Sequence, residues 1–312
     1  MSRDLQHRIL PQDEPMTLHL ATAPRSDNRR LIGMVHGAIG MAIFAGSLPA
    51  TRVAVLGLDA LFLTAGRAAG AGILAALLLA ATRQKLPARA DLVPLLIVAG
   101  GVVLGFPLLT ALALQFVPSA HAIVFVGLLP LVTALFAVLR ATEKPRSAFW
   151  LWAGAGSAAV CAYALWHSTG GFSVPDLLML AAIVVCGLGY AEGSRLSQRI
   201  GSWQTICWAL VLSLPASLPA TLAYLPDDTA DIALPAWLGF AYVTLFSMFI
   251  GFFFWYRGLL LGGIARVSQI QLFQPFLGLT LAALVLGETV SPDIAVVALV
   301  IGLCVWQARK YA

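Results

Sequence analysis

Charge is scarce in this sequence. Charged residues make up 11% of the 312 positions, against about 25% in an ordinary soluble domain. Hydrophobic residues reach 60%, and the mean hydropathy is +0.90. A membrane-spanning helix needs about 20 apolar residues, so ten such helices would leave only short loops. These proportions exclude a water-soluble fold and a separate soluble catalytic domain.

Cysteine is equally rare. The four cysteines lie in apolar stretches and form no CxxC pair: Cys161, Cys186, Cys207 and Cys304. Neither a disulfide framework nor a thiolate metal site is indicated, so we expect packing roles, no metal and no cofactor. The chain also lacks an ATP-binding motif, so any transport would be driven by a gradient.

The basic balance does not indicate a nucleic-acid partner. The formal net charge is +5 and the isoelectric point is near 9.3, but the basic residues are spread among loops instead of lining one face. Residues 1–30 are polar and lack the order of a cleavable signal peptide. We expect them to form a disordered cytoplasmic tail.

Apolar runs predict ten membrane-spanning helices. They lie at residues 31–51, 60–81, 91–115, 118–139, 147–166, 175–195, 203–224, 235–256, 264–286 and 292–308. With the N-terminus in the cytoplasm, all of the 19 lysines and arginines except Arg52 and Arg67 fall at cytoplasmic ends, as the positive-inside rule requires. We therefore predict an all-α integral membrane protein of the bacterial inner membrane, with both termini cytoplasmic. The oligomeric state stays open, and a monomer fits.

An internal similarity divides the chain into two halves. An offset of 145 residues aligns Pro130 with Pro275 and Glu143 with Glu288. Each half, 31–166 and 167–312, holds five predicted helices. Since five is odd, the halves enter the membrane from opposite sides, which predicts a five-plus-five inverted repeat.

These features resemble the EamA-type branch of the drug/metabolite transporter superfamily. The resemblance covers about residues 31–310 and is strongest from Pro275 to the Leu-Gly-Glu ending at Glu288, whereas Ala-Thr-Glu143 departs from that pattern. Arg67 and the segment Phe44-Ala-Gly-Ser47 also resemble family features. The composition is most similar to the YddG-type amino-acid exporters. The resemblance implies a central cavity between helices one to four and six to nine, with helices five and ten peripheral, and it adds Ser47 to the candidate substrate-binding residues.

The ninth predicted helix carries the densest polar group. Ser268, Gln271 and Gln274 precede Pro275. Amides offer donors and acceptors without net charge, as a zwitterionic substrate requires, although they could also bond neighbouring helices. A mid-helix proline leaves the carbonyl four residues earlier without its partner, so Pro130 and Pro275 are candidate kinks that free carbonyls for the cavity or serve packing alone.

Few ionisable residues fall inside the spans. Arg67 must reach the interface or find a partner, and a substrate carboxylate is one option. Glu192 could pair with Arg195 at the interface or couple protons. His121 could bind a carboxylate or titrate, and His36 could do the same from the inner side, although a lone histidine in a membrane more often makes a structural bond.

Aromatic residues could line the cavity or anchor the interfaces. We expect Phe125, Tyr190, Trp208 and Phe252 to lie near the substrate, where rings stack on apolar groups or hold an ammonium group. By depth, Trp166, Trp255 and Tyr256 fit the interfacial belts instead.

The sequence favours a secondary transporter that exports small metabolites, with amino acids foremost, by alternating access. Its partners would be a small-molecule substrate and the lipid bilayer. Two alternatives stay open. Asp227, Asp228 and Asp231 form a DDxxD pattern typical of prenyltransferases, although a solvated acidic loop is the favoured explanation. A phosphorylated-metabolite or nucleotide-sugar exchanger shares the architecture but should carry more cations in its spans.

Overall fold

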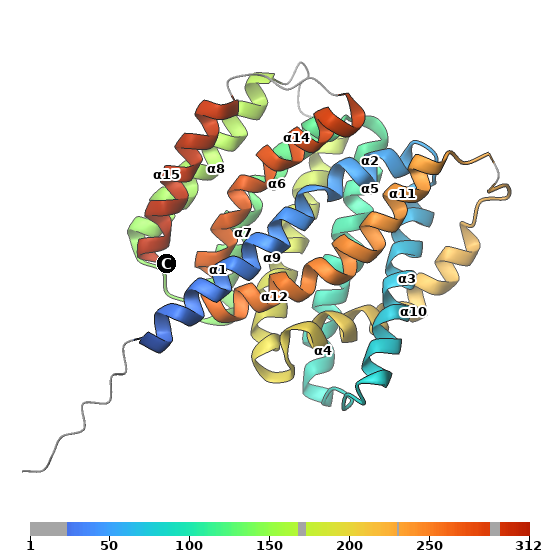
Figure 1. The fold of residues 1–312 in the computed structure, drawn as a ribbon, viewed down its shortest axis with the longest axis horizontal. Helices are drawn as coiled ribbons and strands as arrows, with labels where there is room; N and C mark the ends of the chain where they lie inside the picture. The colour runs from blue at the N-terminus through green and yellow to red at the C-terminus, as the bar shows by residue number, and fades with distance from the viewer. Residues whose placement is uncertain (1–23, 168–172, 230, 288–293) are drawn as a thin grey trace, which may run out of the picture.

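The computed structural model describes residues 24–167, 173–229, 231–287 and 294–312, and all regular structure in these ranges is helical. Figure 1 shows the helices gathered in one bundle. In the first half they are α1 (Pro24–Ala45), α2 (Ser47–Val55), α3 (Ala60–Ala81), α4 (Arg89–Val98), the π-helix η1 (Ala99–Gly105), α5 (Phe106–Phe116), α6 (Ser119–Val126), α7 (Leu129–Ala141) and α8 (Ser147–His167). In the second half they are α9 (Val174–Ile200), α10 (Ser202–Ala223), α11 (Leu234–Tyr242), the π-helix η2 (Val243–Ile250), α12 (Gly251–Gly262), α13 (Ile264–Ser268), the 3-10 helix η3 (Gln269–Phe273), α14 (Gln274–Leu286) and α15 (Ile294–Tyr311).

These pieces join into the ten predicted spans, several of which are broken. Among the described residues, seven helical segments are long and apolar enough to cross a membrane, and shorter apolar helices occupy 129–141 and 299–308. The first span differs most from the prediction, since α1 begins at Pro24 instead of residue 31. The exposed Arg29 and Arg30 extend this helix beyond its apolar stretch, as charged turns can do outside the hydrocarbon.

The backbone repeats the same irregularities in both halves, which confirms the predicted repeat. The π-helix at 99–105 corresponds to the π-helix at 243–250. Thr142 ends α7 in the left-handed conformation with φ of 58°, and Gly287 ends α14 with φ of 68°. These two caps are 145 residues apart, the offset that aligns the prolines.

Pro130 and Pro275 do not lie inside continuous helices, in contrast to the prediction that they form mid-helix kinks. Each lies in the first turn of a new helix, α7 or α14, after a break in the span. A proline fits this position because the first helical residues have no intrahelical acceptor for an N–H group. The fourth and ninth spans are therefore interrupted near their middle. The prolines lie at these breaks instead of freeing a carbonyl inside a continuous helix.

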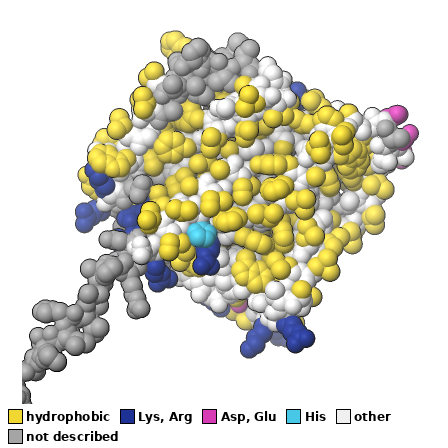
Figure 2. Space-filling model, viewed as in Figure 1, with side chains coloured by type: hydrophobic (Ala, Val, Ile, Leu, Met, Phe, Trp, Pro, Cys, Tyr) yellow, Lys and Arg dark blue, Asp and Glu magenta, His cyan; other side chains and the backbone are white. Residues whose placement is uncertain are grey.

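Charge separates the two ends of the bundle. We call the end that carries Arg83, Lys85, Arg140, Arg199 and Arg266 the basic end. Figure 2 shows most of the Lys and Arg side chains along the lower and left edges of the molecule, a group of Asp and Glu side chains at the upper right, and hydrophobic side chains between. Arg266 donates to the carbonyl of Ala312 at 3.1 Å, so the chain ends at the basic end.

Two pairs of glycines bring α1 and α12 into close contact in the halves of these helices that lie nearest the basic end. The helices lie side by side (Figure 1). A Cβ atom added at Gly258 would lie 2.6 Å from the backbone nitrogen of Gly37, and one added at Gly33 would overlap the backbone of Gly262. Such small-residue contacts let helices pack closely in membranes. At one edge of the bundle α8 packs against α15, so helices five and ten are peripheral.

Candidate functional site

A buried arginine and two serines meet between three spans. The Ser47 and Ser247 hydroxyls are 2.7 Å apart, and Arg67 Nη2 donates to the Ser247 hydroxyl at 3.3 Å. Arg67 is only 5% exposed, its Nε has no hydrogen-bond partner, and no carboxylate among the described residues pairs with it. A buried cation is costly without a counter-charge, so this guanidinium is available to an anion.

The break between α1 and α2 positions Ser47. Helix α1 ends at Ala45, and the Tyr242 hydroxyl donates to the carbonyl of Ile43 at 2.7 Å. A Cβ atom at Gly46 would lie 2.5 Å from that hydroxyl oxygen. Only glycine leaves room for the tyrosine at this point, so residue 46 permits the contact that satisfies the helix end.

Four aromatic rings pack beside this break. The Phe44 ring lies 5.0 Å from Phe252 and 6.0 Å from Trp255, and Tyr190 lies 5.3 Å from Trp255. All four residues are at most 5% exposed, and the Trp255 indole nitrogen has no partner. We call Phe44, Tyr190, Phe252 and Trp255 the aromatic cluster. Trp255 and Tyr256 are fully buried, so the prediction that they belong to the interfacial belt is wrong.

Two glutamines of the ninth span, Gln271 and Gln274, contact this cluster. The Gln274 amide donates to the Phe44 carbonyl at 3.4 Å, and Gln271 interacts with the Tyr190 side chain. The short 3-10 helix η3 turns Gln269 and Gln271 into the interior, where both are fully buried. Both Gln269 amide atoms and the Gln271 oxygen lack partners. Buried polar groups are nearly always hydrogen-bonded, so these orphan atoms indicate a place for a polar ligand.

Ser268, Phe125 and Trp208 lie outside this hydrogen-bonded group. Ser268 is buried and donates to the Ala265 carbonyl at 3.1 Å within its own helix. Phe125 is half-buried and lies 5.7 Å from the His121 ring. Trp208 lines a separate pocket at the basic end.

The two candidate histidines are held by other groups. His121 Nε2 lies 2.6 Å from an Asp176 carboxylate oxygen, and Asp176 caps α9 through Ser173. His36 Nδ1 lies 2.8 Å from the carbonyl of Ile32 in its own helix. These contacts give both residues structural partners away from the aromatic cluster.

Glu192 makes the ion pair that the sequence predicted, and a second one. Its fully buried carboxylate accepts from Arg195 and from Arg140 Nε, the latter at 3.0 Å. Arg140 lies in the last turn of α7 in the first half, and Glu192 lies on α9 in the second. The pair therefore joins the two halves at the basic end.

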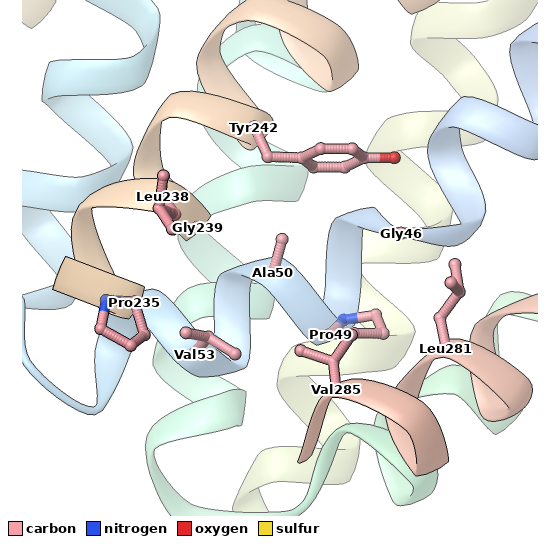
Figure 3. A pocket seen from close by; sticks show the side chains of 10 residues that line it. All are labelled: Gly46, Pro49, Ala50, Val53, Pro235, Leu238, Gly239, Tyr242, Leu281 and Val285. Carbon is pink, nitrogen blue, oxygen red and sulfur yellow. The ribbon is translucent and has the colours of Figure 1, made fainter.

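An apolar groove lies between α2, α11 and α14 (Figure 3). Its volume is about 310 Å³. Pro49, Ala50 and Val53 of α2 face residues of α11 and α14 across it, and the Tyr242 ring extends over Gly46. The Tyr242 hydroxyl is the one polar side-chain group among the lining residues, and it is already bonded to Ile43. The groove thus reaches the break between α1 and α2 at Gly46.

Two helical halves with matching breaks, joined around buried polar and aromatic residues, define the class of membrane transporters built from inverted repeats. The chain belongs to the EamA-like transporter family, whose model matches residues 31–165 and again 173–306. The double match agrees with the repeated backbone irregularities.

Two known proteins are similar to this chain over most of its length. An uncharacterized transporter YdeK of Bacillus subtilis (strain 168) is 57% identical over 285 residues, which cover 91% of this chain and 99% of that protein. A solved structure, described as the crystal structure of a protein, matches with a TM-score of 0.71 at 18% identity, covering 91% of this chain and 99% of its own. That likeness shows the fold.

The sequence did not indicate Ser247 as a site residue, and it predicted Trp255 at the membrane interface. Ser247 lies in an apolar run, and only the π-helix that contains it turns its hydroxyl toward Arg67. The signal that could have indicated it is the 145-residue offset, which aligns this stretch with the glycine-rich segment 99–105 of the first half. A π-helix inside a span frequently marks a functional site.

Proposed function

We propose that this transporter exports small zwitterionic metabolites, amino acids with apolar or aromatic side chains foremost, by alternating access around the aromatic cluster. The observation that carries the proposal is the buried Arg67 guanidinium, which has the Ser247 hydroxyl but no carboxylate as a partner among the described residues. A substrate carboxylate would supply the missing charge through a charge-assisted hydrogen bond.

The aromatic cluster and the glutamines suit the rest of such a substrate. Rings of Tyr190, Phe252 and Trp255 offer faces for an apolar side chain or an ammonium group. The unpartnered Gln269 and Gln271 amide atoms offer neutral donors and acceptors. Since Phe44 and Ser47 flank the same helix break, one ligand at that break would touch both the cluster and the Arg67–Ser247 contact.

The alternative functions find less support. Asp227, Asp228 and Asp231 are exposed in the loop between α10 and α11, and no group of three His, Cys, Asp or Glu side chains among the described residues could hold a metal ion. A prenyltransferase would need such a site for its diphosphate substrate. A phosphorylated-metabolite exchanger would need more than the single cation Arg67 at the site.

Counterflow into proteoliposomes tests the proposal. Vesicles preloaded with one amino acid should take up the same labelled amino acid, and Arg67→Gln should lower this rate at least tenfold. Ser217→Ala is the matched control, because the Ser217 hydroxyl is buried without a partner. Failure of every amino acid to drive counterflow would refute the substrate class, and counterflow by a phosphorylated sugar would favour the exchanger.

The same vesicles test proton coupling by Glu192 or His36. If Glu192 couples protons, Glu192→Gln should abolish uphill transport driven by a pH gradient while counterflow continues. If its two arginine contacts are structural, both activities should fall together as the protein loses stability. His36→Gln is the parallel variant.

A further inference from the structure

A second cavity lies at the basic end, away from the aromatic cluster. Its volume is about 550 Å³. It is formed where α3 ends, α4 begins, α9 ends and α10 begins, and Trp208 forms part of its wall. The Gln84 and Gln204 side chains hydrogen-bond across it at 3.3 Å, which joins the loop after α3 to the start of α10.

The lining of this cavity carries surplus positive charge. Arg83, Lys85 and Arg199 line it, and Asp91 is the acid among its lining residues. Asp91 is 3% exposed and pairs with Arg199 at 3.0 Å. That pair neutralises one of the three cations, so the charges of Arg83 and Lys85 remain for a ligand.

Arg83 has a backbone conformation that favours glycine. Its φ is 51°, in the left-handed region. The amide of Gln84 donates to the Leu79 carbonyl at 2.9 Å and that of Arg83 to the Ala80 carbonyl at 3.0 Å, which is the Schellman pattern that ends helices. Glycine is the usual residue there, and another residue costs about 1–2 kcal/mol. Arg83 thus holds a strained backbone conformation at the edge of the cavity that it lines.

From these observations we infer that the cavity binds a phosphate-bearing anion through Arg83 and Lys85. The arginine fork matches phosphate oxygens in pairs, and lysine adds a point charge. The cavity is larger than one phosphate group, so it also accepts an organic substituent. Its location at the ends of the spans, beside the 81%-exposed Leu86, is where anionic lipid headgroups bind between transmembrane helices. A soluble phosphate compound has the same recognising group.

The binding experiment uses the purified full-length protein in two arms. In the first, inorganic phosphate is titrated at constant ionic strength in a neutral detergent, and the melting temperature is followed. In the second, the protein is placed in nanodiscs of phosphatidylcholine with or without phosphatidylglycerol, and bound lipid is counted by mass spectrometry. A response only to phosphatidylglycerol identifies a lipid site, and a response to phosphate identifies a soluble anion. No response in either arm overturns the inference.

The test variant is Arg83→Gly combined with Lys85→Gln. Because glycine suits the left-handed position, the double variant should fold at least as well as the natural chain. Its affinity for the responding probe should fall at least tenfold. Lys144→Gln with Arg146→Gln is the matched control, since it removes the same charge from another exposed loop at the basic end. Equal affinities of the two double variants would overturn the inference. Lys85→Gln alone should give an intermediate loss.

Counterflow of amino acids separates this site from the transport site. The Arg83 and Lys85 variant should keep its counterflow rate in phosphatidylcholine vesicles, and Arg67→Gln should keep its phosphate or phosphatidylglycerol binding. Loss of both activities in either variant would contradict two independent sites.

Discussion

The carboxylate of Glu143 caps the helix that begins at Ile264. Its two oxygens accept from the backbone amides of Ile264 at 2.7 Å and Ala265 at 2.8 Å. Glu143 follows α7 in the first half, and Ile264 begins α13 in the second, so one side chain joins the corresponding spans of the two repeats. An anion at a helix N-terminus satisfies amides without partners and the positive end of the helix dipole. We therefore expect this contact to hold the basic end closed.

Glu143→Gln should weaken that closure. The variant loses the charge-assisted bonds, at a cost of about 1–2 kcal/mol. In an otherwise cysteine-free chain, a cysteine at the buried Ser268 should be labelled faster by a water-soluble maleimide when Glu143 is replaced. Lys144→Gln is the control in the same loop. Unchanged labelling would show that the contact does not regulate opening.

Gly258→Ala should destabilise the packing of α1 on α12. The added methyl group would lie 2.6 Å from the Gly37 nitrogen, and overpacking of this kind costs about 1–3 kcal/mol. Gly154→Ala is the control, because a Cβ atom there meets nothing within 4 Å and alanine favours the helix by about 1 kcal/mol. Melting temperatures in detergent should fall for the first variant and hold or rise for the second. The reverse order would disprove the close approach.

Ser247→Ala should cost more than Ser217→Ala. The first removes the hydroxyl that contacts both Ser47 and Arg67, which leaves a buried cation unpaired at a cost of about 1–3 kcal/mol. The second removes a buried hydroxyl without a hydrogen-bond partner and should be neutral. Thermal unfolding of the two variants measures the difference, and equal melting temperatures would contradict the Arg67 contact.

Thr142→Gly should stabilise the protein. Thr142 is β-branched and has φ of 58°, whereas its repeat counterpart Gly287 has φ of 68°. The left-handed conformation costs a residue other than glycine about 1–2 kcal/mol. Glycine has more conformational freedom in the unfolded chain, which offsets about 0.5–1 kcal/mol of that gain. We expect a net gain of about 1 kcal/mol, seen as a higher melting temperature. A lower one would show that the threonine side chain contributes more than the strain it carries.

The ten spans and their inverted repeat could be predicted because both depend on local sequence. Hydropathy over about 20 residues identifies a membrane helix, and the 145-residue offset of the two prolines identifies the halves. The pairing of Glu192 with Arg195 was also predictable, since residues three apart on a helix are neighbours. The charge of Arg67 in the second span and the polar glutamines in the ninth likewise distinguished these two spans from the more apolar ones.

The partners of those residues required the tertiary structure. Arg67 meets Ser247 across 180 positions and Gln274 meets Phe44 across 230, and no local pattern relates such distant residues. A π-helix and a 3-10 helix also change the direction in which side chains point, so positions counted on a regular helix are displaced. For that reason depth alone assigned Trp255 to the membrane interface, whereas the folded bundle buries it in the aromatic cluster. Hydropathy therefore identifies the segments that cross the membrane. Which side chains form the site depends on how those segments pack, because each helix's rotation is set by its neighbours.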